Sequence, residues 1–170
     1  MKTLYTDYVA TPIGDVLLVA DGESLVYVDF ADNTERLQRL LARRYRDFTL
    51  IQQEHPNGFS DQIKRYFAGE LDALNQLPVA LGGTPFQQRV WLKLRDILVG
   101  QTMSYGQLAT QLGLPKGARA VGITNGLNPI GIVLPCHRVI GANHSLTGYA
   151  GGIERKRWLL RHEGAMFKDN

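Results

Sequence analysis

The order of apolar and polar residues predicts three short strands at the start of the chain. Apolar residues alternate with polar ones, or run together, at positions 4–10, 15–20 and 24–30, and the segments TPIG and DGE separate these runs. Glycine and proline at such separations favour tight turns between neighbouring strands. We therefore expect an antiparallel meander.

Two helices are predicted to follow these strands. Asp32 is a candidate N-cap for a helix whose apolar face begins at Leu37. A second, shorter helix is predicted to begin at Ser60 and to end at Gly69. Residues 72–83 follow no clear period, so we expect them to connect two parts of the chain.

The second half of the chain has stronger helix signals. Thr84 and Gln87 form a capping box around Pro85, and Ser104 with Gln107 repeats the box. These boxes predict two helices, the first ending at the glycine of LVG, and ARAVGITNG predicts a third. The last two suggest a helix-turn-helix motif, although the intervening GLPKGA is longer than usual and an ordinary helical hairpin fits as well.

The third of these helices, residues 118–126, favours a nucleic-acid role. It carries one long cationic side chain, Arg119, among alanine and glycine residues. A helix with so little bulk can lie closely against a DNA groove while the cation probes it. The sequence therefore favours a role in which this helix lies in a groove of duplex DNA.

Charge is distributed unevenly along the chain. Residues 1–84 carry 8 Lys and Arg against 12 Asp and Glu, a net charge of −4, whereas residues 85–170 carry 11 against 4, a net charge of +7. A basic half can bind a polyanion. A basic half can equally be a solvated surface, so the charge distribution alone does not show whether this half binds nucleic acid.

Composition limits the architecture and the location. A length of 170 residues suffices for one ordinary domain or two small ones. One cysteine forms no internal disulfide and no cysteine-rich zinc site, no apolar run is long enough to span a bilayer, and the first residues do not resemble a signal peptide. We expect a cytoplasmic protein with no membrane partner, for which a monomer suffices.

The predicted fold class is α+β in two domains. Residues 1–83 are expected to form a small antiparallel sheet with helices and a connecting segment. Residues 84–170 are expected to form a mainly helical domain that contains the helix-turn-helix and a strand with the cysteine.

The single cysteine, Cys136, lies in the segment IVLPCHRVIG, residues 132–141. Its apolar neighbours predict a buried strand, and a buried thiol is most often inert. Two features favour a reactive thiol instead. Pro135 cannot donate to a sheet and should end or bend the strand, and His137 with Arg138 places polar, potentially cationic groups beside the sulfur, where they favour the nucleophilic thiolate.

An activated thiol needs a base and a group that orients the base. His137 is the candidate base, directly or through a water, and Glu163 in the segment WLLRHEG is the candidate orienting carboxylate. The dipole at a helix C-terminus disfavours a carboxylate, so we expect another interaction to hold Glu163. His55, His144 and His162 are alternative bases that are otherwise expected at the surface.

The motifs SYGQLA, ARAVG, NP, PCHRVI, GYAGG and WLLRHEG occur in this order between residues 84 and 164. Together they resemble the O6-alkylguanine-DNA alkyltransferases, the methylated-DNA–protein-cysteine methyltransferases, and the first half of the chain resembles their bacterial two-domain form more loosely. The resemblance implies direct DNA repair. An alkyl group would pass from O6-alkylguanine, or from O4-alkylthymine, in duplex DNA to Cys136 in one irreversible turnover, without a cofactor.

The resemblance also assigns roles in catalysis. It implies that Cys136 attacks the alkyl carbon, that His137 removes the thiol proton through a water, and that Glu163 orients the imidazole. Asn128 resembles the family's hinge asparagine between the recognition helix and the reactive segment. Tyr105 resembles the tyrosine that assists the leaving base.

Substrate contacts are implied in the same way. Arg119 resembles the arginine that fills the gap left by an extruded nucleotide, whose extrusion costs stacking energy. The other expected DNA contacts are Ser104, Ala120, Gly122 and Asn125. The expected pocket for the base consists of Pro135, Val139, Tyr149, Ala150 and Gly151. In this pocket Tyr149 would pack against the flat base, while Ala150 replaces a serine that many relatives carry.

Two other function classes fit the same residues. A Cys-His-acid hydrolase would need an oxyanion hole and would turn over repeatedly. A DNA-binding module would keep the thiol as passive packing. The three classes differ in what they do to a substrate. An alkyltransferase gains an alkyl group, a hydrolase cleaves esters repeatedly, and a DNA-binding module only binds.

Overall fold

The computed structural model describes residues 1–54 and 56–169, and it confirms a mixed α+β fold. The chain groups into two compact units, Met1–Gly83 with Pro129–Val133, and Thr84–Asn128 with Leu134–Asn170. The predicted boundaries, 1–83 and 84–170, do not include this return of the chain to the first unit.

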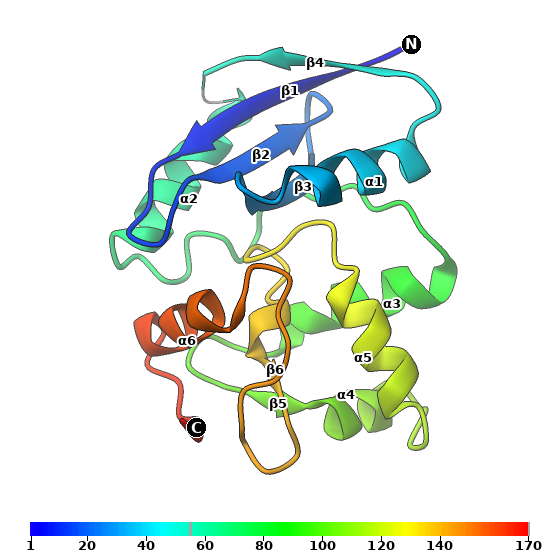
Figure 1. The fold of residues 1–170 in the computed structure, drawn as a ribbon, viewed down its shortest axis with the longest axis vertical. Helices are drawn as coiled ribbons and strands as arrows, with labels where there is room; N and C mark the ends of the chain where they lie inside the picture. The colour runs from blue at the N-terminus through cyan, green and yellow to red at the C-terminus, as the bar shows by residue number, and fades with distance from the viewer. Residues whose placement is uncertain (55, 170) are drawn as a thin grey trace. The chain divides into compact units, whose positions relative to one another are not determined.

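The N-terminal unit is built on a four-stranded sheet (Figure 1). The predicted antiparallel meander is confirmed as β1 (Lys2–Val9), β2 (Val16–Ala20) and β3 (Leu25–Phe30). A fourth strand, β4 (Phe48–Gln52), pairs in parallel with β1 and gives the order β3-β2-β1-β4. β4 was not predicted from the sequence, because it is a half-exposed edge strand with a weak apolar pattern.

One core cluster of this unit lies between the sheet and its first helix, α1 (Thr34–Arg44). β2 and β3 are buried along their whole length. Leu17 and Val19 of β2 pack in one cluster with Leu37 and Leu41 of α1. Burial of each such side chain stabilises the fold by about 1.5–3 kcal/mol.

Both helices of this unit begin differently from the prediction. α1 begins after Asn33, so the prediction that Asp32 caps it is wrong. A short 3-10 turn, η1 (Pro56–Gly58), precedes α2 (Phe59–Phe67). α2 begins one residue before the predicted start, so Ser60 lies inside the helix, where its hydroxyl donates to the carboxylate of Asp7 on β1.

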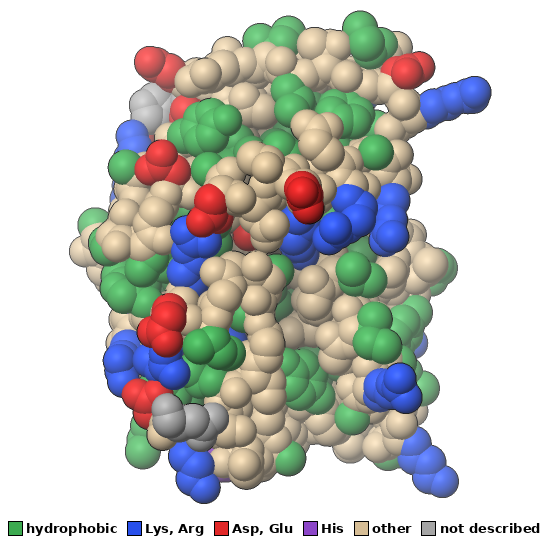
Figure 2. Space-filling model, in the orientation of Figure 1, with side chains coloured by type: hydrophobic (Ala, Val, Ile, Leu, Met, Phe, Trp, Pro, Cys, Tyr) green, Lys and Arg blue, Asp and Glu red, His purple; other side chains and the backbone are tan. Residues whose placement is uncertain are grey.

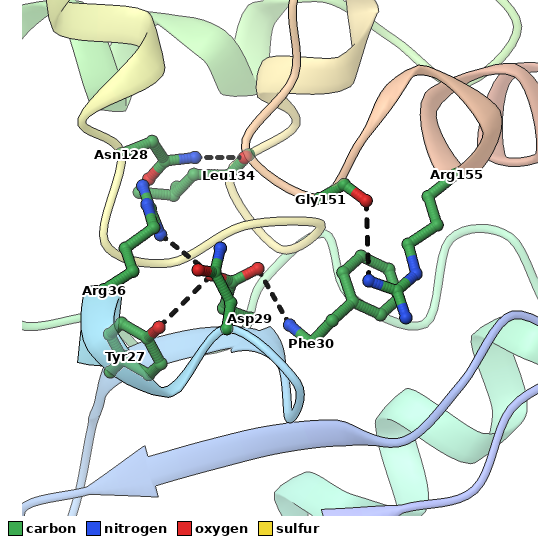
Figure 3. A network of polar contacts seen from close by, with 9 residues as sticks. Tyr27, Asp29, Phe30, Arg36, Asn128, Leu134, Gly151 and Arg155 are labelled. Atoms are coloured by element: carbon green, nitrogen blue, oxygen red, sulfur yellow. Dashed lines mark hydrogen bonds and ion pairs between the residues drawn. The ribbon is translucent and has the colours of Figure 1, made fainter. Parts of the chain in front are cut away.

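A buried carboxylate, Asp29, organises the end of β3 (Figure 3). It accepts hydrogen bonds from the hydroxyl of Tyr27 at 3.2 Å, from Nη1 of Arg36 at 3.1 Å and from the backbone N–H of Phe30 at 2.8 Å. Burial, followed by the negative charge of Asp29, raises the pKa of Tyr27 far above its usual range. The Asp29–Arg36 pair therefore joins β3 to α1 within this unit.

The C-terminal unit is mainly helical (Figure 1). Its helices are α3 (Pro85–Lys93), α4 (Tyr105–Gln111), α5 (Ala118–Gly126) and α6 (Ile153–His162). Its two strands, β5 (Met103–Ser104) and β6 (Val139–Ile140), pair in parallel, and its 3-10 turns are η2 (Leu94–Asp96) and η3 (Cys136–Arg138). No helix among the described residues is long and apolar enough to cross a membrane.

Both predicted capping boxes are confirmed. The backbone N–H of Gln87 donates to the hydroxyl of Thr84 at 3.1 Å, and the N–H of Gln107 donates to that of Ser104 at 3.0 Å. Each glutamine side chain accepts from the backbone N–H of its partner. α3 is shorter than predicted, since it gives way to η2 after Lys93.

The predicted helix pair is also present. α4 and α5 pack against each other, and the connecting residues 112–117 turn at Gly113, which has a φ of +79°. The N–H of Gly113 donates to the carbonyl of Thr110, and the N–H of Leu114 donates to that of Ala109. This pattern closes the helix end as a Schellman motif, for which glycine is favoured.

Candidate active site and nucleic-acid interface

Cys136 lies on a turn and not on a strand, which corrects the prediction of a cysteine-bearing strand. Pro135 has a φ of −81° and a ψ of 67°, and the N–H of Cys136 donates to the carbonyl of Leu134 at 2.8 Å. These values describe a γ-turn. The chain therefore bends at Pro135, and Cys136 begins η3 with 7% of its surface exposed.

His137 and Glu163 form a buried pair. Nε2 of His137 lies 2.9 Å from Oε2 of Glu163, and both side chains are fully buried. Burial alone would raise the pKa of Glu163, but His137 and Arg138 outweigh it and hold that pKa well below its usual range. Burial lowers the pKa of His137, although Glu163 opposes this shift. The pair therefore consists of a neutral imidazole and an ionised carboxylate.

This pairing fixes the tautomer of His137. An ionised carboxylate can only accept a hydrogen bond, so Nε2 of His137 carries the proton. Nδ1 is then the acceptor nitrogen, and it has no hydrogen-bond partner in the part of the chain that the structure describes. A neutral imidazole with an available nitrogen is the form that a general base requires.

Arg138 holds Glu163 from a second direction, a role that the sequence analysis missed. Its Nε lies 2.9 Å from Oε1 of Glu163 and its Nη2 lies 3.0 Å from Oε2. A third nitrogen, Nη1, donates to the carbonyl oxygen of Ile97 at 2.6 Å. The two-point contact is the geometry that favours arginine over lysine. It supplies the interaction that was expected to hold a carboxylate at a helix C-terminus.

Lys156 is a further residue that the sequence analysis missed. It is fully buried on α6, and its Nζ donates to the carbonyl oxygens of Val139 at 2.7 Å and Thr147 at 3.2 Å. Burial lowers its pKa to about 8. Its spacing along the helix could have indicated that it is buried. Lys156 lies four positions before Leu160 and seven positions before Glu163, so it shares their face of the helix.

Two buried asparagines lie near the C-terminal end of α5, Asn125 within the helix and Asn128 just after it. The side-chain amide of Asn128 donates to the carbonyl oxygen of Leu134 at 2.8 Å (Figure 3), which links the end of α5 to the segment before the cysteine. Asn125 is 5% exposed and donates to the carbonyl oxygen of Cys136 at 3.3 Å. The prediction that Asn125 contacts DNA is therefore wrong, because its spacing from Val121 places it on the buried face.

The opposite face of α5 is accessible. Arg119 and Ala120 are exposed, while Gly122 and Ser104 are half-buried. Over α4 and α5, Figure 2 shows basic and hydrophobic side chains without acidic ones. A groove of about 640 Å³ is lined by Tyr105, Ala118, Arg119, Gly122, Ile123, Gly126, Thr147 and Gly148.

The five predicted pocket residues differ in their exposure. They are Pro135 and Val139, which are buried, Tyr149 and Gly151, which are half-buried, and Ala150, which is exposed. The carbonyl oxygen of Gly151 accepts from Nη1 of Arg155 at 3.4 Å (Figure 3), close to the start of α6. Their contacts with a base stay predictions.

The other three histidines were alternative candidates for the base. His144 is exposed in a loop, with a φ of 64°. His162 stacks on Trp158 with ring centroids 4.6 Å apart. His55 lies outside the described residues. His137 is therefore the histidine that combines adjacency to the thiol with a buried carboxylate.

Known proteins resemble the chain over nearly its whole length. Models for the DNA-binding domain and the ribonuclease-like domain of 6-O-methylguanine DNA methyltransferase match residues 85–165 and 4–81. A methylated-DNA–protein-cysteine methyltransferase of Shigella flexneri is 52% identical over 167 residues, which cover 96% of this chain and 98% of the relative.

Solved structures agree with these sequence matches. The O6-methylguanine methyltransferase of Mycobacterium tuberculosis matches with a TM-score of 0.80 and 42% identity, over 95% of this chain and 93% of that chain. A structure of the M. tuberculosis protein in complex with DNA matches with a TM-score of 0.78 and 42% identity, over 95% and 92%. The chain belongs to the methylated-DNA–protein-cysteine methyltransferase family.

Proposed function

We propose that this protein repairs DNA by transferring an alkyl group from O6-alkylguanine, and from O4-alkylthymine, in duplex DNA to its own Cys136. The observation that carries the proposal is the neutral imidazole of His137, oriented by an ionised Glu163, on the residue next to the chain's one cysteine. Family membership supports the same reaction.

The proposed reaction is a displacement at carbon. The thiol proton of Cys136 passes to Nδ1 of His137, directly or through a water. The sulfur then attacks the alkyl carbon, and a C–S bond forms as the C–O6 bond breaks, with its electron pair moving to the leaving base. The hydroxyl of Tyr105 gives this base a proton, the phenolate then takes a proton from water, and the imidazolium of His137 returns its extra proton to water. The product thioether has no leaving group that water can readily displace, so each chain reacts once.

Two cations support the site in this proposal. Arg138 fixes Glu163, which in turn fixes His137. Lys156 and Cys136 are close enough for their charges to interact, and a buried ammonium group favours the thiolate over the neutral thiol. The low pKa of Lys156 means that this support weakens as the pH rises above about 8.

DNA is proposed to bind through α4 and the exposed face of α5 in the minor groove. An alkylated base within the stack is out of reach of a thiol, so the nucleotide must be extruded. Arg119 is exposed beside the groove and is the side chain proposed to occupy the gap in the duplex. A cytoplasmic monomer without a cofactor suffices for this reaction.

Incubation with a duplex containing one O6-methylguanine tests the proposal. The intact mass of the protein should rise by one methyl group in place of hydrogen. Cys136→Ser should show no gain but should bind the duplex with the wild-type affinity, because the proposed DNA contacts lie on α4 and α5. Repeated ester cleavage without a mass gain would support a hydrolase, and binding without either reaction would support a DNA-binding module.

A further inference from the structure

Thr147 contacts two residues of the site, Tyr105 through its hydroxyl and Lys156 through its backbone carbonyl. Its hydroxyl oxygen lies 2.7 Å from the phenol oxygen of Tyr105, although the two residues are 42 positions apart. Its backbone carbonyl accepts from Nζ of Lys156 at 3.2 Å. Both Tyr105 and Thr147 line the groove beside α5. Neither the spacing of the motifs nor the family resemblance assigned Thr147 a role.

The direction of the hydrogen bond decides what the tyrosine can do. Either oxygen can donate. If the phenol donates to Thr147, its proton is engaged and cannot pass to a ligand. If Thr147 donates, the phenol proton is free to point into the groove, and the bond strengthens as negative charge develops on the phenol oxygen.

The environment of Tyr105 makes such support necessary for proton donation. Burial raises the pKa of Tyr105, while the hydrogen bond from Thr147 lowers it and the charge on Cys136 raises it. A phenol with a raised pKa gives up its proton reluctantly. A donor aimed at its oxygen offsets part of that resistance at the moment when the leaving base needs a proton.

We propose that Thr147 is a positioning residue for alkyl transfer: its hydroxyl donates to the phenol oxygen of Tyr105, directs the phenol proton toward the leaving base and stabilises the phenol as it releases that proton. This inference rests on the proposed function, since it acts through the tyrosine that protonates the base.

Two substitutions at residue 147 test this role in single-turnover methyl transfer from a methylated duplex. Thr147→Val removes the hydroxyl at nearly constant shape and should slow transfer about threefold to tenfold, the effect of one hydrogen bond. Thr147→Ser keeps the hydroxyl and should react within about twofold of wild type. Both variants keep the carbonyl that binds Lys156, so the buried ammonium is not disturbed.

A matched control comes from β4 in the N-terminal unit. The hydroxyl of Thr49 donates to the sulfur of Met1 at 3.1 Å, and neither residue belongs to the site or to the proposed DNA-binding surface. Thr49→Val makes the same chemical change and should leave the rate within about twofold of wild type. Should valine at residue 147 disturb the fold in a melting experiment, Thr147→Ala removes the same hydroxyl without new bulk.

A double-mutant cycle separates positioning from general structural support. In a Tyr105→Phe background there is no phenol oxygen to receive the bond, so Thr147→Val should have no further effect on the residual rate. If Thr147→Val slows the Tyr105→Phe protein by the same factor as wild type, or if Thr147→Ser is as slow as Thr147→Val, the inference is overturned. A wild-type rate for Thr147→Val overturns it as well.

Failure of the inference is distinguishable from failure of the proposed function. If the wild-type protein gains no methyl group on Cys136, the function itself is wrong. If the wild-type protein is methylated there and the cycle is additive, alkyl transfer stands and only the role of Thr147 is lost.

Discussion

Replacing Glu163 with glutamine preserves the shape of the side chain and removes its charge. In the wild-type protein the carboxylate accepts from Nε2 of His137 and from Nε and Nη2 of Arg138, at 2.9 to 3.0 Å. Glutamine has one acceptor oxygen, and its amide nitrogen would face N–H donors. Arg138, which is 6% exposed, would lose its countercharge, and His137 would lose the group that fixes its tautomer.

The size of both effects can be worked from these contacts. Removal of one partner from a buried ion pair costs about 3–5 kcal/mol. For a chain of this length, about 2–4 °C is lost per kcal/mol, so the melting temperature should fall by about 6–20 °C. Methyl transfer should slow by about 10²–10⁴-fold, the usual contribution of a general base.

Calorimetry measures the change in melting temperature. Single-turnover methyl transfer measures the change in rate, at a temperature where both the wild-type and the Glu163→Gln protein are folded. Glu154→Gln is the matched control on the same helix. Glu154 pairs with Arg157, but its side chain is 85% exposed, so the loss should be within about 1 kcal/mol and the rate should not change. A Glu163→Gln protein that melts at the wild-type temperature would show that the carboxylate does not stabilise the buried site, and one that transfers methyl at the wild-type rate would show that it does not orient His137 for catalysis.

Three further predictions concern other parts of the chain. Arg119→Ala should slow transfer from duplex DNA about 10–100-fold but leave reaction with a free alkylguanine base unchanged, and equal slowing of the two substrates would contradict its role in extrusion. Lys156 has a pKa of about 8 in the folded state and an ordinary value of 10.5, so the unfolded chain binds more protons between these values. Urea unfolding should therefore show a rise in stability of roughly 2–3 kcal/mol from pH 8 to 10, which Lys156→Met should abolish. Thr84→Ala should cost about 1 kcal/mol in the same assay through loss of the capping box, whereas Thr84→Ser should not.

Local signals predicted the elements whose determinants lie within a few residues. The boxes at Thr84 and Ser104 are examples, because cap and partner are three positions apart. The contact made by Ser60, the predicted start of α2, is not local. Ser60 binds Asp7, 53 positions away, and no local pattern contains that contact. β4 has only a weak apolar pattern of its own, and it pairs with β1 across 46 positions, from Lys2↔Phe48 to Thr6↔Gln52.

The same distinction between local signals and contacts that depend on the tertiary fold applies to the residues of the site. Cys136, His137 and Glu163 were identified from adjacency and motif order, and the bend at Pro135 follows from its missing N–H. The contacts of Lys156 depend on how α6 packs, which the sequence did not predict.

Asn125 was assigned to the wrong face of α5 for a related reason. The helix carries small residues on more than one side, so its apolar pattern does not identify the buried face. Its contact with the carbonyl oxygen of Cys136 requires the tertiary fold.

The central claim is that the sulfur of Cys136 is the final acceptor of the alkyl group. The direct measurement is a titration of the protein with increasing amounts of methylated duplex, followed by proteolysis and mass spectrometry of every peptide. Uptake should saturate at one methyl group per chain, and the peptide containing Cys136 should carry all of it. Methyl on another residue, or continued loss of O6-methylguanine while Cys136 stays unmodified, would show that Cys136 is not the final acceptor.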